Sequence, residues 1–165
     1  MSVAEFVIAM ALTSTLAGLL VVQYAFFTRS FARLQQYMYM GGKSRYAMDR
    51  ISKDIRQADQ IVSFSTNQVT ILVNGTNVTF AYDPDLKQLN RTSAGKTELF
   101  LTGCDYLKFE VMTRDTATNT FVLPTATGTN DAKVVRMNWI CSRQMFGAKT
   151  TTENIQSATV TMRHK

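Results

Sequence analysis

The chain has 165 residues, and its 18 basic and 12 acidic residues give a formal net charge of +6. This length suits one folded domain. The basic residues are spread from Arg29 to Lys165, and aspartates interleave with them in the densest run, residues 43–56. Such mixing is typical of a solvated helix face, so the charge supports at most a weak attraction to nucleic acid or another acidic surface.

Motifs for catalysis are absent from the sequence. The only histidine is His164, next to the last residue, which argues against a Ser-His-Asp triad and a histidine-rich metal site. The chain has no glycine-rich phosphate loop, and Asp83 and Asp85 flank Pro84 as in a turn. We therefore expect a protein that is not an enzyme and that has neither a cofactor nor a metal site.

The first predicted element is an apolar helix. Residues from Phe6 to Thr28 include no Asp, Glu, Lys or Arg, and about 20 apolar residues suffice for a helix to cross a bilayer. An amphipathic helix of a soluble domain would carry charge on one face, and a secretory signal peptide would begin with basic residues. We therefore assign residues 1–28 to a transmembrane or filament-core segment.

One carboxylate, Glu5, stands immediately before the apolar run. Ser2-Val3-Ala4-Glu5 fits the S-x-x-E capping box, and a glutamate is favourable at a helix amino terminus. Capping gives no reason for the apolar run that follows. The sequence therefore leaves open a local role and a role in assembly.

Residues 29–60 are predicted to continue this helix as an amphipathic half. Its apolar positions recur every three or four residues and form one stripe: Ala47, Ile51, Ile55, Ala58 and Val62. Gly41-Gly42 costs about 2 kcal/mol relative to alanine in a helix interior and predicts a bend or break. Gly18 is a second weak point, inside the apolar part.

From about Ile61 the pattern becomes that of strands. Asn74-Gly75 between two β-rich runs, Gln68–Val73 and Thr76–Tyr82, is a strong hairpin signal. Further strands are predicted at Thr97–Leu101, Tyr106–Thr113, Phe121–Leu123, Val134–Cys141 and Ala158–Arg163. Residues 61–165 thus form a β-rich globular domain, and the fold class is α+β, with a long amino-terminal helix packed on an antiparallel β-sheet.

Two cysteines, Cys104 and Cys141, follow the apolar segment. In an exported domain an isolated pair most simply forms one disulfide, whereas in a cytosolic domain both would be buried thiols. The apolar segment favours the disulfide.

Taken together, these features resemble a mature, leader-cleaved subunit of the type IV pilin and pseudopilin family. The resemblance rests on Met1-Ser2-Val3-Ala4-Glu5 followed by Phe6-Val7-Ile8-Ala9-Met10-Ala11-Leu12, on the long helix with a β-domain behind it, and on the cysteine pair. The segment Arg50–Ala58 resembles the helix end of larger minor pilins and pseudopilins. The chain departs from the family in having Met1 where Phe is usual, Ser-Val-Ala before the glutamate, and no proline in the apolar helix.

The resemblance implies a structural filament subunit. A prepilin peptidase would remove a leader and N-methylate Met1, and the subunit would wait in the bacterial inner membrane with its domain in the periplasm. An assembly ATPase and an inner-membrane platform protein would then insert it into a cell-surface pilus or a periplasm-spanning filament. Met1 and Glu5 would direct assembly, and the filament core would contain Phe6, Val7, Ile8, Met10, Leu12, Leu16, Leu19 and Leu20. A basic leader would also explain the orientation in the membrane. Without it, the positive-inside rule would place Arg29, Arg33 and the domain that follows them in the cytoplasm.

Two alternatives remain open at this stage. The chain could be a minor pseudopilin of a type II secretion system, or a single-pass, membrane-tethered binding module that does not polymerise. A simple tether has no need of Glu5, whereas a polymer that buries this carboxylate does.

Overall fold

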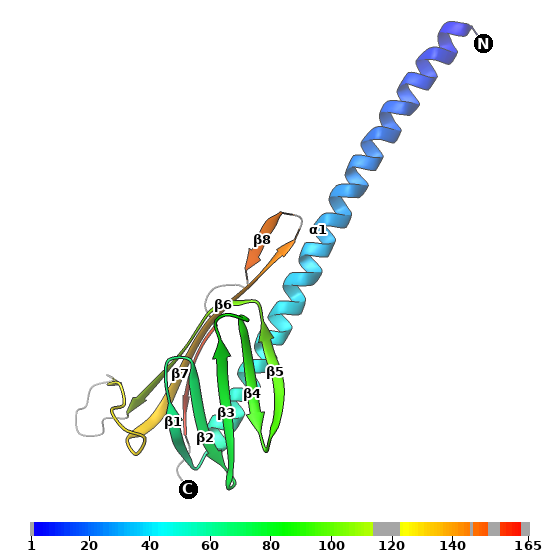
Figure 1. Cartoon of the computed structure of the whole chain (residues 1–165). Coiled ribbons are helices and arrows are strands. Elements are labelled where there is room, and N and C mark those ends of the chain that lie inside the picture. Colours follow the sequence, from blue (N-terminus) through cyan, green and yellow to red (C-terminus); the bar gives the residue numbers. More distant parts are fainter. Residues whose placement is uncertain (1, 114–122, 146, 152–155, 163–165) are drawn as a thin grey trace. The chain divides into compact units, whose positions relative to one another are not determined.

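The computed structural model describes residues 2–113, 123–145, 147–151 and 156–162. It consists of two compact units, Met1–Met38 and Tyr39–Lys165. Within these described residues, one α-helix is followed by nine β-strands (Figure 1). The α+β class with an amino-terminal helix and antiparallel strands is confirmed.

Helix α1 (Val3–Gln57) is continuous through Gly18, Gly41 and Gly42. The predicted break at Gly41-Gly42 is therefore wrong. Met40 and Ser44, which flank the two glycines, are both buried. Burial of the helix face on either side of the glycines offsets their unfavourable helix propensity.

The helix ends at Gln57, before the predicted end at residue 60. The Asp59 backbone N–H donates to the Leu72 carbonyl at 2.8 Å, and the Asp59 carboxylate accepts from the Asn74 backbone N–H at 3.1 Å. These bonds join the chain to the first sheet immediately after the helix ends. Val62, predicted as the last apolar position of the helical stripe, instead lies in a strand and is 41% exposed.

The first sheet is a five-stranded antiparallel meander in sequence order. Its strands are β1 (Gln60–Phe64), β2 (Gln68–Val73), β3 (Thr76–Asp83), β4 (Gln88–Ser93) and β5 (Lys96–Thr102). Asn74 and Gly75 have φ of 48° and 75°, which confirms the predicted hairpin, and Ala94-Gly95 repeats this geometry between β4 and β5. Strand β4 was not predicted because its sequence is almost entirely polar and only Leu89 is buried.

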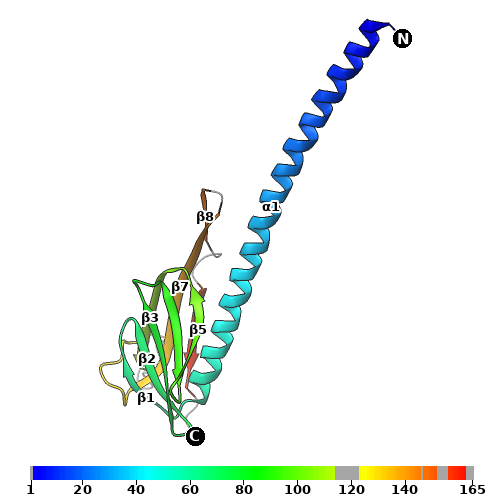
Figure 2. The same cartoon turned by 45° about the vertical axis from the view of Figure 1, so that its right-hand side comes forward.

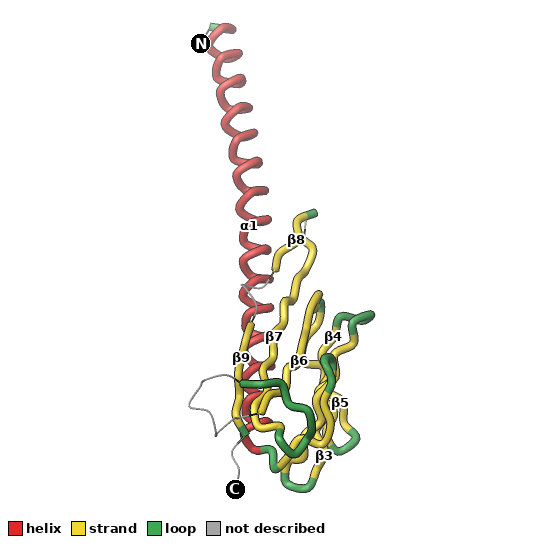
Figure 3. The backbone as a smooth tube through the Cα atoms, turned by 90° about the vertical axis from the view of Figure 1, so that its left-hand side faces the viewer, coloured by secondary structure: helices red, strands yellow, loops and turns green. Residues whose placement is uncertain are grey.

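The second sheet was not predicted as a separate layer. It contains β6 (Cys104–Thr113), β7 (Ala132–Met145), β8 (Ala148–Thr151) and β9 (Gln156–Thr161). Beyond the body of the sheet β7 continues into a hairpin with β8 (Figure 2), a strand that the sequence did not predict. Strand β7 is central and lies between β6 and β9 (Figure 3). The strand expected at Phe121–Leu123 falls mostly outside the described residues, and Leu123 itself is not in a strand.

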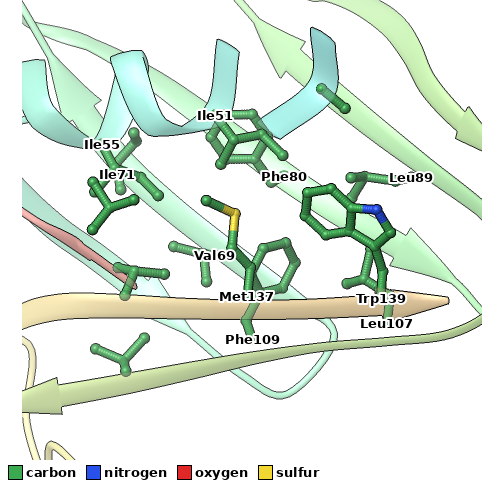
Figure 4. Close-up of a cluster of buried hydrophobic side chains, with 14 of the residues drawn as sticks. Ile51, Ile55, Val69, Ile71, Phe80, Leu89, Leu107, Phe109, Met137 and Trp139 are labelled. Atoms are coloured by element: carbon green, nitrogen blue, oxygen red, sulfur yellow. The ribbon is translucent and has the colours of Figure 1, made fainter. Parts of the chain in front are cut away.

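The core of the second unit joins one helix face to both sheets. Figure 4 shows Ile51 of α1 beside Phe80 of β3 and Ile55 beside Ile71 of β2, and Met137 and Trp139 of β7 belong to the same buried cluster. The Trp139 indole N–H donates to Ser44 Oγ at 2.7 Å, and both residues are fully buried. The predicted stripe at Ala47, Ile51, Ile55 and Ala58 is confirmed as the buried face.

A buried ion pair also ties the helix to the first sheet. Arg91 Nε of β4 donates to Asp54 Oδ2 at 2.8 Å, and the two side chains are only 13% and 7% exposed. Arg50, one turn earlier on the helix, lies 4.0 Å from the other carboxylate oxygen and is 40% exposed. Because this pair joins one position of α1 to one position of β4, it helps to set how the helix is aligned along the first sheet.

Candidate assembly site

The apolar part of α1 exposes large side chains on every side. The eight residues predicted for a filament core are all more than half exposed: Phe6, Val7, Ile8, Met10, Leu12, Leu16, Leu19 and Leu20. At 100° per residue these positions cover the whole circumference of the helix. A helix that is apolar all round requires an apolar environment on all sides, and α1 is long and apolar enough to cross a membrane.

Hydroxyl groups inside this segment are satisfied by the helix itself. Thr13 Oγ1 donates to the carbonyls of Ala9 and Met10 at 2.9 and 3.0 Å, and Ser14 Oγ donates to the Ala11 carbonyl at 2.9 Å. Thr15 and Thr28 bond in the same way. These groups therefore need no water or partner chain, and the segment can enter an apolar environment without leaving them unpaired.

Glu5 closes a reciprocal capping box with Ser2. The Ser2 backbone N–H donates to Glu5 Oε2 at 2.8 Å, and the Glu5 backbone N–H donates to Ser2 Oγ at 3.3 Å. The capping interpretation of Glu5 is thus confirmed in the single chain. Met1 lies outside the described residues, so its pairing with Glu5 and its N-methylation stay predictions.

Cys104 and Cys141 form a disulfide between directly opposed positions of β6 and β7. Both cysteines are buried. The preceding residue, Gly103, has φ of +70°, and a Cβ there would lie 2.7 Å from the Ser142 carbonyl oxygen. The disulfide predicted from the sequence is present, and the alternative of two thiols is wrong for this structure.

Asp105 is the centre of a charged cluster that sequence reasoning missed. Its carboxylate accepts from Lys149 Nζ at 2.6 Å, from Lys87 Nζ at 2.8 Å and from the Ser142 hydroxyl. The hydrogen bonds from Lys149, Lys87 and Ser142 hold the pKa of Asp105 well below its usual range, and the bond to Asp105 raises the pKa of Lys87. The cluster fastens the β7–β8 hairpin and the β3–β4 turn to β6, and no local sequence pattern could have joined residues so far apart.

Further charges form a ladder on the second sheet. Glu110 lies 2.9 Å from Lys108 and 3.7 Å from Arg136. The hydrogen bond from Lys108 lowers the pKa of Glu110 and raises that of Lys108. Burial raises the pKa of Tyr82, whose hydroxyl donates to the Cys104 carbonyl at 2.8 Å. These groups have structural partners within the domain.

The Asp83-Pro84-Asp85 segment forms the predicted turn. Asp83 Oδ1 accepts from the backbone N–H groups of Asp85 and Leu86 at 2.9 and 3.0 Å. Across the described part of the chain, no group of three or more His, Cys, Asp or Glu residues is arranged to hold a metal ion.

No protein-family model, curated protein or solved structure matches the chain. The long amino-terminal apolar helix, the helix face packed on antiparallel strands and the disulfide are compatible with a pilin-like architecture.

Proposed function

We propose that the chain is a structural subunit of a type IV pilus or of a related pilus-like filament, assembled through residues 1–28. One observation carries the proposal: an apolar helical surface is exposed around its whole circumference, on the same chain as a folded domain with its own core. A bilayer would cover this surface before assembly. A bundle of equivalent helices from other subunits would cover it in the filament.

Glu5 gives this proposal its specificity. At a membrane surface the carboxylate can reach headgroups and water at little cost. In a filament core, neighbouring apolar helices would surround it, and an unpaired charge there would cost several kcal/mol. The amino group of Met1, on the same chain or on a neighbour, is a partner of opposite charge. Pairing would occur only at the correct axial offset between subunits, so it would select register.

A membrane-tethered module that does not polymerise is the second candidate. The capping box favours it, because the bonds between Ser2 and Glu5 explain the glutamate without a partner chain. Under this alternative a bilayer covers the apolar helix permanently. The two candidates differ in whether the negative charge of Glu5, or only its hydrogen-bonding ability, is required.

Three substitutions separate charge from capping. Glu5→Gln keeps a side chain that can complete the capping box but removes the charge. Ser2→Ala keeps the charge but weakens the cap, at a typical cost of about 1 kcal/mol. Glu5→Val removes both. If the proposal holds, Glu5→Gln and Glu5→Val sharply reduce filaments whereas Ser2→Ala assembles well.

The assay is electron microscopy of sheared filaments with mass spectrometry of their main component, in cells that carry a pilus assembly system. Membrane fractionation controls for insertion, which all three variants should retain. Abundant normal filaments from both Glu5 variants would remove Glu5 from the assembly mechanism. Absence of filaments from the unaltered chain would favour the tether.

A further inference from the structure

We propose that a cationic groove beside Tyr39 binds the acidic β3–β4 turn of a second copy of the chain. This inference rests on the filament function proposed above and names a contact between the globular domains. The groove has a volume of about 180 Å³, and its lining includes Tyr39 and Lys43 of α1, Leu99 and Thr102 of β5, and Arg143 of β7.

The groove presents two cations around one aromatic ring. Lys43 Nζ and Arg143 Cζ each lie 5.9 Å from the centroid of the Tyr39 ring. Arg143 also donates to Thr102 Oγ1 at 3.1 Å, which holds the guanidinium in place. Within the described residues, neither cation forms an ion pair with a carboxylate. Two cations in proximity without a counter-charge favour an anionic partner.

The groove is also partly apolar. Tyr39 is 53% exposed and Leu99 is 49% exposed. A partner that fits must therefore combine a negative charge with an apolar side chain. A phosphate or another small anion would satisfy the cations but would leave these two side chains uncovered.

The β3–β4 turn of the same chain has this combination. Asp85 and Leu86 are adjacent and exposed, and Leu86 is 64% exposed. In the described part of the chain Asp85 has no ion-pair partner, whereas Asp54, Asp105 and Glu110 all have one. The backbone of the turn is fixed by the two bonds to the Asp83 carboxylate, so little conformational entropy would be lost on docking.

The alternation of side chains along β7 places Asp105 and Tyr39 on opposite sides of that strand. Ser142 contacts Asp105, which binds Lys87 at the end of the turn. The next residue, Arg143, contacts Tyr39 in the groove. Successive residues of a strand point to opposite faces. Asp85 and Leu86 do not line the groove of their own chain, so the contact would join two different surfaces of neighbouring copies. Such a heterologous contact builds an open helical array where the rotation between copies does not close a ring.

Charge reversal and rescue in the full-length chain test the contact. Lys43→Glu and Asp85→Lys should each lower filament yield roughly tenfold, the size expected for loss of one close charge pair across an interface. The double variant should recover most of the yield, because it restores opposite charges. Lys53→Glu, a reversal on the same helix but outside the groove, is the matched control and should assemble normally. Trp139 fluorescence verifies that each variant is folded.

Cross-linking tests proximity independently of yield. Filaments carrying both Lys43→Cys and Asp85→Cys should give dimers and larger oligomers with a short bismaleimide, whereas either single variant should not. Unchanged yield for Lys43→Glu together with absence of cross-links would overturn the contact while leaving the filament proposal intact. Loss of yield without rescue, accompanied by reduced binding to phosphatidylglycerol vesicles, would instead assign the groove to an anionic lipid and also overturn the contact.

Discussion

Replacing Asp54 with alanine should strongly destabilise the second unit of the chain. The substitution removes one partner of the buried pair with Arg91, in which Nε and Oδ2 are 2.8 Å apart. Arg91 remains in place, only 13% exposed and without its carboxylate. Because a buried charge that loses its partner still bears the desolvation penalty, such changes typically cost about 3–5 kcal/mol.

This magnitude is large compared with the stability of a typical domain, roughly 5–15 kcal/mol. With a urea dependence of about 2 kcal/mol per molar, the unfolding midpoint should fall by roughly 2 M. The assay is urea titration of the full-length chain in detergent, followed by the fluorescence of Trp139. This residue is the only tryptophan and is fully buried, so its emission reports directly on the core.

Arg50→Ala is the matched control. Arg50 approaches the same carboxylate, but at 4.0 Å and with 40% of its side chain exposed, so its removal should cost less than about 1 kcal/mol. Replacing both buried partners, with Asp54→Leu and Arg91→Met, should recover much of the loss because no unpaired charge remains. Equal midpoints for Asp54→Ala and Arg50→Ala would refute the reasoning.

Three further predictions use the same fluorescence assay. Ser44→Ala leaves the buried indole N–H of Trp139 unpaired and should lower the free energy of unfolding by about 1–3 kcal/mol; an unchanged midpoint would show that another acceptor replaces the serine. Gly103 has a φ of +70°, and a Cβ at this position would lie 2.7 Å from the Ser142 carbonyl oxygen. Gly103→Ala should therefore lower the free energy of unfolding by more than about 1 kcal/mol. Gly18→Ala is the control and should not lower it, because no atom lies within 4 Å of the added Cβ. The lowered pKa of Asp105 means that its ionised form stabilises the fold above its unfolded pKa of about 3.9, and that this stabilisation is lost as pH falls through the lower folded value. As pH falls from 5 to 3, the free energy of unfolding should therefore decrease less for Asp105→Asn than for the unaltered chain. Parallel plots of this free energy against pH for the two proteins would contradict the prediction.

The sequence by itself determined the features that depend on neighbouring residues. The charge-free run before Arg29 specifies an apolar helix, because hydropathy and length suffice to identify such a segment. Ser2 and Glu5 are three positions apart, so their spacing alone predicts the capping box that they form. Asn74-Gly75 specified its hairpin because few residue types adopt the positive φ that the turn requires.

Other features depended on contacts between distant residues and were decided only by the tertiary structure. Strand β4 is polar and forms because β3 and β5 pair with it on both sides. The helix continues through Gly41-Gly42 because burial of Met40 and Ser44 outweighs local propensity. Sequence periodicity cannot show which distant strands share a sheet, so the division into two sheets was missed.

The ion pairs show most clearly that contacts between distant residues cannot be predicted from local sequence. Asp54 forms an ion pair with Arg91, and Asp105 forms ion pairs with Lys87 and Lys149. The partners are too far apart in the sequence for a local spacing rule to predict these pairs. In the sequence, each of these residues is indistinguishable from an ordinary surface charge. Their pairing follows from the paths of the strands, which depend on the packing of the whole core. Local sequence therefore specified the helix, its cap and the hairpin, whereas only the folded chain could specify the partners of its charges and the position of the groove beside Tyr39.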